Sequence, residues 1–381
     1  MNFEILDDKE PVTIVVVGTG GGGSNAVNEM IKRGIKGVKF IAVNTDLKDL
    51  KDSNAEIKLQ IGSRLTSGQG AGGRPEVGEK AALEDEESFR EILEGADMVF
   101  ITAGMGGGTG TGSAPVIARI AKSLGALTVG VVTKPFGFER KHRMRIAEEG
   151  ITKLRESVDT LIVIPNQNLL ENVDKNTSCI DAFSMANDVL RQGVQGISDL
   201  ILETGLINID FADVEAIMRD QGDAIMSIGS GSGDKAVSDA VDSAMNNPLL
   251  EDSSVKGATR VLIYVSGGKN FPLTDYNDAI EQITADTSPE AVVIAGLYIN
   301  QELEDKLRIT VIATGFENKR TKQTAQIPNI SGVKPGEVIS EDEFHKMKEK
   351  VPIGNWLPHR NYDYDDLEIP TVVRDSRGAT K

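Results

Sequence analysis

The 381-residue chain contains a single cysteine, and this scarcity excludes several kinds of protein. Cys179 alone can form no disulfide within the chain, so the fold does not depend on an oxidising compartment. The three histidines, His142, His345 and His359, lack the spacing of metal ligands. We therefore predict no metal site built from cysteine or histidine side chains.

Long apolar runs are missing as well, since no stretch approaches the roughly 18 residues of a membrane-spanning helix. Residues 1–11 form an acidic N-terminal tail without the apolar core of a signal peptide. The sequence therefore predicts a cytoplasmic protein with no direct membrane insertion.

The net charge is −17, and the excess of acidic residues is confined to one part of the chain. Residues 318–381 carry 11 basic and 10 acidic residues, so the residues before them hold all of the excess negative charge. An acidic body disfavours nucleic acid and anionic lipid as partners. A polyanionic ligand must instead be held by backbone amides, helix dipoles and a metal ion.

Strands and helices alternate over residues 12–178, which predicts a Rossmann-like α/β domain with a parallel sheet. β-branched and apolar runs predict strands at Thr13–Val17, Val38–Val43, Asp97–Thr102, Thr128–Thr133 and Leu161–Ile164. Apolar residues at helical spacing predict helices at Ser24–Lys32 and Ser113–Leu124.

A long amphipathic helix is predicted over residues 179–203, where apolar residues recur every three or four positions until Gly205. A loop and a short helix follow in residues 204–220, and residues 221–317 predict a second, smaller α/β domain with a mixed sheet. Residues 318–364 are polar and rich in proline, as in a flexible, disordered linker. Residues 365–381 regain apolar side chains and read either as a docking peptide or as an unstructured tail.

The first glycine loop, Gly18–Asn25, links a predicted buried strand to a helix. Consecutive glycines let the backbone approach a ligand closely, and a helix N-terminus favours an anion. The loop contains G-x-G-x-x-G, and Asp46 ends the next strand. Taken alone, this pattern favours an NAD-dependent oxidoreductase.

A second glycine loop, Gly104–Gly112, also connects a strand to a helix. Two such loops at neighbouring strand ends place two sets of amides around one anion, which is more than a dinucleotide site needs. No G-x-x-x-x-G-K-[ST] occurs, so the chain is not a P-loop NTPase. A third glycine stretch, Gly68–Arg74, reads as a mobile lid or as a plain surface loop.

Residues that could contact a nucleotide base lie at two places, after a predicted strand and near the start of the long helix. Pro165–Asn168 comes at a strand end, and Phe183 and Asn187 lie four residues apart on one helix face. An aromatic ring beside an amide suits a purine, although a core phenylalanine beside a buried asparagine fits the same spacing.

Two carboxylates follow the long helix in the segment Asn208–Asp213. Asp210 and Asp213 read as the cap and first turn of the next helix. Alternatively, the pair orients a water molecule for attack on a phosphate.

The chain resembles bacterial cell-division GTPases of the FtsZ family, in the tubulin superfamily, over roughly residues 12–316. The resemblance lies in the order and spacing of Gly20–Asn25, Gly104–Gly112, Thr133–Phe136, Pro165–Asn166, Phe183 with Asn187, and Asn208–Asp213. Asp365–Arg374 resembles the docking peptide of that family. The resemblance as a whole implies a GTP-dependent filament at the mid-cell division ring, tethered by a membrane adaptor such as FtsA.

The resemblance also implies a role for each site residue, with GTP or GDP as ligand and Mg²⁺ as cofactor. The phosphates would contact Gly20, Gly21, Gly22, Asn25, Gly72, Gly106, Gly107, Gly108, Thr109 and Gly110. Glu139 and Arg143 would contact the ribose, and Asn166, Phe183 and Asn187 would hold guanine. Residues 204–220 would be a catalytic loop and its helix, with Asn208, Asp210 and Asp213 acting on the GTP of the next subunit, and residues 221–317 an activation domain.

The chain departs from the family pattern near Glu139, where many members read Phe-Glu-Gly-Arg-Lys-Arg and this chain has Arg140 in place of the glycine. Lys48 replaces a common glutamine, and the tail ends in Thr371–Arg374 where bulkier apolar residues are usual. A tubulin-like segregation or structural filament is the alternative within the superfamily.

Overall fold

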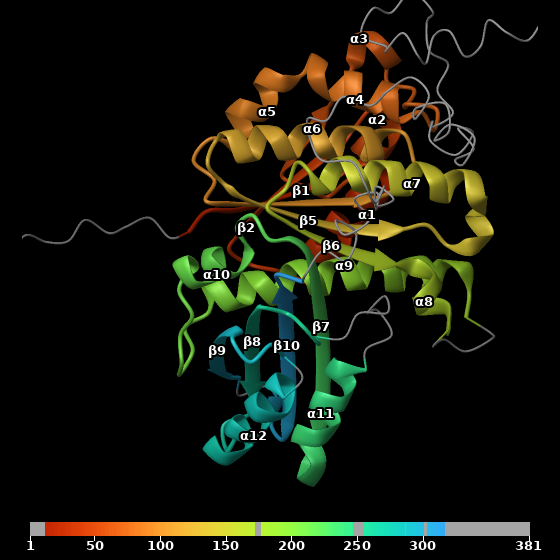
Figure 1. Ribbon diagram of the computed structural model, residues 1–381. Coiled ribbons are helices and arrows are strands. Elements are labelled where there is room, and N and C mark those ends of the chain that lie inside the picture. The colour runs from red at the N-terminus through yellow and green to blue at the C-terminus, as the bar shows by residue number, and fades with distance from the viewer. Residues whose placement is uncertain (1–11, 172–176, 247–254, 286, 301–302, 317–381) are drawn as a thin grey trace, which may run out of the picture. The chain divides into compact units, whose positions relative to one another are not determined.

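The computed structural model describes residues 12–171, 177–246, 255–285, 287–300 and 303–316 (Figure 1). The predicted tail 1–11, linker 318–364 and docking peptide 365–381 lie outside the described residues. Within the described ranges, no helix has the length and apolarity needed to cross a membrane.

A parallel sheet forms the first half of the fold, as the sequence predicts. It runs in the order β3-β2-β1-β4-β5-β6 and consists of β1 (Ile14–Thr19), β2 (Val38–Asn44), β3 (Ile57–Gln60), β4 (Met98–Gly104), β5 (Leu127–Lys134) and β6 (Thr160–Pro165). Thr19 lies beside Val43 on one side and Ala103 on the other. The carboxyl ends of β1, β2 and β4 therefore meet at one edge.

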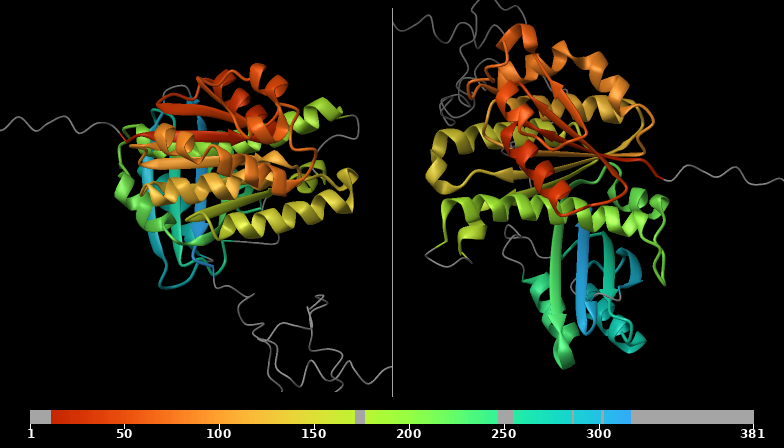
Figure 2. Two further views of the ribbon diagram at one scale, coloured as in Figure 1. Left: turned by 90° about the horizontal axis from the view of Figure 1, so that it is seen from above. Right: turned by 180° about the vertical axis from the view of Figure 1, so that it is seen from behind.

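Helices cover both faces of this sheet (Figures 1 and 2). The helices of this half are α1 (Gly20–Lys32), α2 (Leu47–Lys51), α3 (Ser63–Thr66), α4 (Pro75–Glu84), α5 (Glu86–Leu93), α6 (Thr109–Ser123), α7 (Arg140–Arg155) and α8 (Asn166–Glu171), with a 3-10 turn at Gly137–Glu139. The predicted starts of α1 and α6, at Ser24 and Ser113, are wrong, because both helices begin inside the glycine loops. The glycines thus form first helical turns, whose free amides point outward.

Helix α9 (Cys179–Leu202) is the long predicted helix, and Ser178 caps it by accepting the Asp181 N–H at 3.1 Å. It runs between the parallel strands and the second half of the fold (Figures 1 and 2). A β-carbon on Gly193 would lie 3.0 Å from Val131 of β5, and one on Gly196 would lie 3.1 Å from Thr310 of β10. The helix therefore packs closely against strands of both halves. Helix α10 (Phe211–Met218) follows.

The second half is a mixed sheet, as predicted, and two helices pack on it. It contains β7 (Gly222–Ser232), β8 (Arg260–Gly267), β9 (Val292–Ile299) and β10 (Lys306–Thr314), with a 3-10 turn at Gly233–Lys235, α11 (Ala236–Met245) and α12 (Leu273–Thr284). β10 is antiparallel to β7 and β8, and β8 is parallel to β9. β7 also pairs with β6, so ten strands form one continuous sheet.

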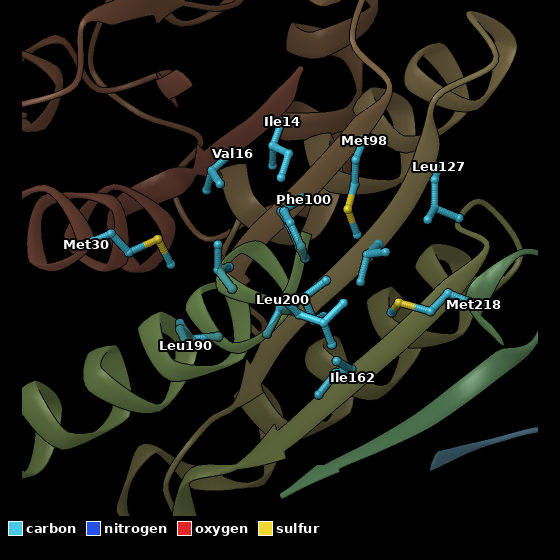
Figure 3. Close-up of a cluster of buried hydrophobic side chains, with 14 of the residues drawn as sticks. Ile14, Val16, Met30, Met98, Phe100, Leu127, Ile162, Leu190, Leu200 and Met218 are labelled. Carbon is cyan, nitrogen blue, oxygen red and sulfur yellow. The ribbon is translucent and has the colours of Figure 1, made fainter. Parts of the chain in front are cut away.

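Apolar side chains fill the layers between sheet and helices. One cluster lies between β1, β4, β5 and β6 on the sheet and α1, α9 and α10 (Figure 3). In it, Phe100 of β4, Leu190 and Leu200 of α9, and Met218 of α10 are almost completely buried. A second cluster lies on the opposite face under α4–α7, and a third lies under α11 and α12. The burial of Met218 ties α10 to the parallel sheet.

Candidate nucleotide site and catalytic loop

The two glycine loops lie against each other at the carboxyl edge of the sheet. Gly20 has a φ of +68°, and a β-carbon there would lie 2.7 Å from the Gly110 nitrogen. A β-carbon on Gly22 would lie 3.0 Å from the Gly104 nitrogen. Only glycine permits this approach, which leaves a cradle of backbone amides at the N-termini of α1 and α6.

Buried hydroxyl pairs hold the cradle together. The Thr19 and Ser113 hydroxyls lie 2.5 Å apart, and those of Thr45 and Thr109 lie 2.6 Å apart. The Gly106 N–H donates to the Thr111 hydroxyl at 2.9 Å. These bonds connect β1, the end of β2 and the start of α6, so the amides are ordered by the protein itself.

Glu139 and Arg143 border the second glycine loop. Gly106 has a φ of +100°, and a β-carbon there would lie 2.7 Å from the Arg143 carbonyl oxygen. Arg143 Nη1 lies 3.0 Å from Glu139 Oε2, and Glu139 Oε1 accepts the Phe136 N–H at 2.8 Å. Both predicted ribose contacts are therefore beside the phosphate cradle. Asn25 is exposed on α1.

The third glycine stretch covers Gly108, whose β-carbon position lies 2.8 Å from both Ala71 and the Arg74 nitrogen. Gly72 has a φ of +59° and open space at its β-carbon position. The stretch therefore borders the cradle, with Gly72 on its open side.

An aromatic cluster lies next to Glu139. Phe183 of α9 meets Phe136 edge-on at 5.2 Å between ring centroids, and Phe138 stacks on Phe136 at 5.1 Å. Phe183 is 45% exposed, so the alternative of a core phenylalanine is wrong. Asn187 is half-buried on the same helix face, and its amide can accompany the exposed ring in holding a flat base.

Two buried amides point to a ligand. Asn166 Oδ1, after β6, and Asn44 Nδ2, at the end of β2, are buried without a hydrogen-bond partner among the described residues. Unpaired buried polar atoms are costly, and a nucleotide with donors and acceptors would satisfy them. The described part of the chain contains no group of three histidine, cysteine or acidic side chains placed to hold a metal ion.

Sequence reasoning missed three of these residues: Asn44, Thr45 and Phe138. Asn44 and Thr45 could have been found because they follow a strand at the same sheet edge as the glycine loops. Phe138 carried no usable signal, since its contact with Phe136 depends on the 3-10 turn at Gly137–Glu139. Asp46, which completes the dinucleotide-type pattern of the first glycine loop, caps α2 by accepting the Lys48 N–H at 2.9 Å.

The two carboxylates of the candidate catalytic loop cap α10. Asp210 Oδ1 accepts the Asp213 N–H at 2.8 Å, and Asp213 Oδ2 accepts the Asp210 N–H at 3.2 Å. Asn208 Oδ1 accepts the Gly205 N–H at 2.6 Å. The capping interpretation is confirmed, and Asp210 is also exposed.

This loop is remote from the cradle of the same chain. Phe183, beside the cradle, lies in the first turns of α9, and the loop follows the end of that helix (Figure 1). A helix of 24 residues is roughly 36 Å long. The structure brings all other predicted site residues to one edge, but Asn208, Asp210 and Asp213 lie at the opposite end.

A cradle of backbone amides, an aromatic cluster and two buried asparagine side chains with unpaired polar atoms lie at the carboxyl edge of a parallel sheet. This combination indicates an α/β protein that binds a purine nucleotide. Residues 13–174 match the model of the Tubulin/FtsZ family GTPase domain, and residues 222–317 match that of the FtsZ family C-terminal domain.

Individual relatives agree with both matches. The chain is 45% identical over 379 residues to the cell division protein FtsZ of Pseudomonas putida, covering 99% of this chain and 93% of that protein. An empty FtsZ dimer from M. jannaschii is 44% identical, with a TM-score of 0.76, over 81% of this chain and 89% of that one. CetZ2 of Haloferax volcanii, at 19% identity and a TM-score of 0.68 over 82% of this chain and 96% of that one, shares the fold.

The chain therefore belongs to the FtsZ family, and it is a polymerising GTPase of cell division. The oxidoreductase suggested by the first glycine loop alone is excluded.

Proposed function

We propose that GTP binds across the edge where the two glycine loops meet. The phosphates contact the amides of the cradle, and the ribose contacts Glu139 and Arg143 beside Gly106. Guanine lies between Phe183 and the amides of Asn166 and Asn187. The support is the contact of the loops together with the unpaired Asn166 oxygen. The phosphate contacts proposed are Gly20, Gly21, Gly22, Asn25, Gly72, Gly106, Gly107, Gly108, Thr109 and Gly110.

Mg²⁺ fits this site as a cofactor carried by the nucleotide. The cradle has neither the lysine of a P-loop nor a cluster of acidic ligands among its described residues. Mg²⁺ binds through one or two protein oxygens plus phosphates, and when bound it neutralises developing phosphate charge. The protein's own contribution is a set of ordered amides and two helix N-termini.

Hydrolysis takes place between subunits. One observation carries this proposal: Asp210 and Asp213 lie at the far end of α9 from the cradle, where they reach no nucleotide of their own chain. In a head-to-tail assembly the loop of one subunit meets the GTP of the next, a heterologous contact that extends as a filament. The dimer recorded for the M. jannaschii relative supports self-association.

In that contact the carboxylates act on water. Asp210 and Asp213 accept hydrogen bonds from the attacking water and orient it in line with the γ-phosphate. The amides of the cradle stabilise the charge that develops on the phosphate oxygens. Asn208 holds the loop by accepting the Gly205 N–H, so it orders the segment that carries the carboxylates.

The test replaces each carboxylate by an amide. Asp210→Asn keeps the N-cap of α10, because asparagine caps as well as aspartate, and Asp213→Asn keeps a side-chain oxygen that can accept the Asp210 N–H. Both variants lose the charge. We expect both variants to bind GTP and to sediment as polymer, while GTP turnover falls about 10²-fold or more. Asp239→Asn, an exposed first-turn aspartate of α11, is the matched control and leaves turnover unchanged. Turnover within twofold of the parent in both variants contradicts the proposal.

The filament acts at the mid-cell division site in the cytoplasm, and residues 365–374 bind a membrane adaptor such as FtsA. The support is the family membership and the apolar spacing of that peptide, which lies outside the described residues. An adaptor supplies the membrane attachment, since the described residues contain no membrane-spanning helix.

A further inference from the structure

The C-terminal end of α10 is held by side chains from three different strands. An α-helix leaves its last four carbonyl groups without partners inside the helix. In α10 these belong to residues 215–218. The Glu215 carbonyl accepts the Arg219 N–H at 2.8 Å, and each of the other three accepts a side-chain donor.

The three donors stand at the ends of strands. Arg260, the first residue of β8, donates to the Ala216 carbonyl. Thr314, the last residue of β10, donates its hydroxyl to the Ile217 carbonyl at 2.8 Å. Thr160, the first residue of β6, donates to the Met218 carbonyl. We call Arg260, Thr314 and Thr160 the α10 socket.

The socket joins both halves of the fold at one helix end. Thr160 lies within the matched GTPase domain, and Thr314 and Arg260 lie within the matched C-terminal domain. Thr160 and Thr314 are buried, as are Ile217 and Met218, so these two hydroxyls exchange no partner with water. A helix of eight residues is marginal alone, because short helices fray without tertiary contacts.

The opposite end of the same helix carries Asp210 and Asp213. Eight residues of helix span roughly 12 Å, so a small rotation at the socket displaces the carboxylates at the other end. A misplacement of about 1 Å can cost a reaction on the order of 10²-fold in rate. The geometry of the socket is therefore coupled to the geometry of the carboxylates.

We propose that Thr160, Thr314 and Arg260 are positioning residues, which set the angle at which α10 presents Asp210 and Asp213 to the nucleotide of the neighbouring subunit. This inference rests on the proposed function, because it requires those carboxylates to act in trans. The side-chain hydrogen bonds of these three residues lead to α10 and not to the glycine loops, so we expect their removal to leave the chain's own nucleotide cradle unchanged.

The test uses the full chain with Thr160→Val, Thr314→Val and the double variant, which remove the hydroxyls and keep the side-chain shape. We expect the double variant to hydrolyse GTP about tenfold more slowly per sedimented subunit. Its GTP affinity and its sedimented fraction should stay within twofold of the parent. Thr160→Ser and Thr314→Ser, which retain the hydroxyls, should restore turnover, and that rescue separates positioning from packing.

Thr284→Val is the matched control. Thr284 is a half-buried threonine at the end of α12, and its hydroxyl donates to the Ile280 carbonyl of the same helix at 2.7 Å. It should leave turnover per polymerised subunit unchanged. If the double variant unfolds, turnover of the single variants Thr160→Val and Thr314→Val tests the positioning role, because each variant removes one of the three socket hydrogen bonds.

Asp213→Asn distinguishes the two proposals. Parent-like turnover of the valine variants, with Asp213→Asn inactive, overturns the positioning role and leaves the trans site standing. Parent-like turnover of both Asp210→Asn and Asp213→Asn overturns the proposed function instead. If the valine variants lose turnover only because less protein assembles, and the serine variants fail to restore it, that result also contradicts the positioning role.

Discussion

Arg140 adopts a backbone conformation that only glycine adopts without strain. Its φ is +80° and its ψ is 160°, at the junction between the 3-10 turn and α7. Such a conformation costs on the order of 1–3 kcal/mol for a residue with a β-carbon. The strain lies between Glu139 and Arg143, which pair beside the cradle. This backbone conformation explains physically why glycine is common at this position in the family.

We predict that Arg140→Gly stabilises the protein. The relief of strain exceeds the roughly 0.5–1 kcal/mol lost because glycine makes the unfolded chain more flexible. The melting temperature should rise by about 2 °C, measured by scanning calorimetry with and without GTP. Lys141→Gly, one residue further into α7, should lower it. A lower melting temperature for Arg140→Gly would show that the contacts of the Arg140 side chain outweigh the backbone strain.

Asp199 is a carboxyl group held in an unfavourable environment on α9. Burial, with the nearby Glu203 carboxylate, raises the pKa of Asp199 to about 6, against weaker opposing effects of Gln195, Arg308 and Arg191. The folded pKa thus lies above the unfolded value of 3.8. The folded state binds more protons between these values, so stability falls as pH rises from about 4 to about 6.

We therefore predict that Asp199→Asn raises the unfolding free energy at pH 7.5 by up to about 3 kcal/mol and has little effect at pH 4. Urea unfolding at both pH values measures this. Asp188, on the same helix, is the control, because its pKa is shifted in the opposite direction. Burial alone would raise its pKa, but hydrogen bonds from Arg191 and Gln192 lower it, so Asp188→Asn should be destabilising at pH 7.5. An equal change at both pH values for Asp199→Asn would contradict the assignment.

The strands β1, β2, β4, β5 and β6 and the helices α1, α6 and α9 were predicted, whereas β7 and the helices α4, α5 and α7 were missed. The apolar runs of β1 and β4 and the helical spacing in α9 follow from their own residues. β7 was missed because it alternates glycine and serine at its end. A β-carbon on Gly229 would lie 1.9 Å from the Ala240 carbonyl oxygen, so β7 needs glycine to receive α11. That requirement is a tertiary contact, which no local pattern displays.

Part of the candidate site was predictable from local sequence patterns, and the part that depends on tertiary or subunit contacts was not. Glycine loops at strand ends predict a phosphate cradle, because parallel strands place their carboxyl ends together. The role of Phe183 was ambiguous from spacing alone. Its 45% exposure rules out a core position, and its contact with guanine stays a prediction. The carboxylates of Asp210 and Asp213 were ambiguous too. They cap a helix within one chain, and their proposed second role needs a neighbouring subunit.

For the molecule as a whole, the separation of two half-sites by α9 is the central feature. The cradle lies at one end of this helix and α10 at the other (Figure 1). In the proposed assembly one subunit therefore offers two different surfaces, and contacts of that kind repeat without closing. Each subunit in such a filament completes the site of one neighbour, so catalysis depends on assembly.

The most direct measurement is the rate of phosphate release per subunit as a function of protein concentration, at saturating GTP with Mg²⁺. A site shared between subunits predicts almost no turnover below a threshold concentration. Above it, the rate should rise in proportion to the polymer that sediments. A rate per subunit that is constant from far below that threshold to far above it would show that each chain is a complete enzyme, and would contradict catalysis in trans.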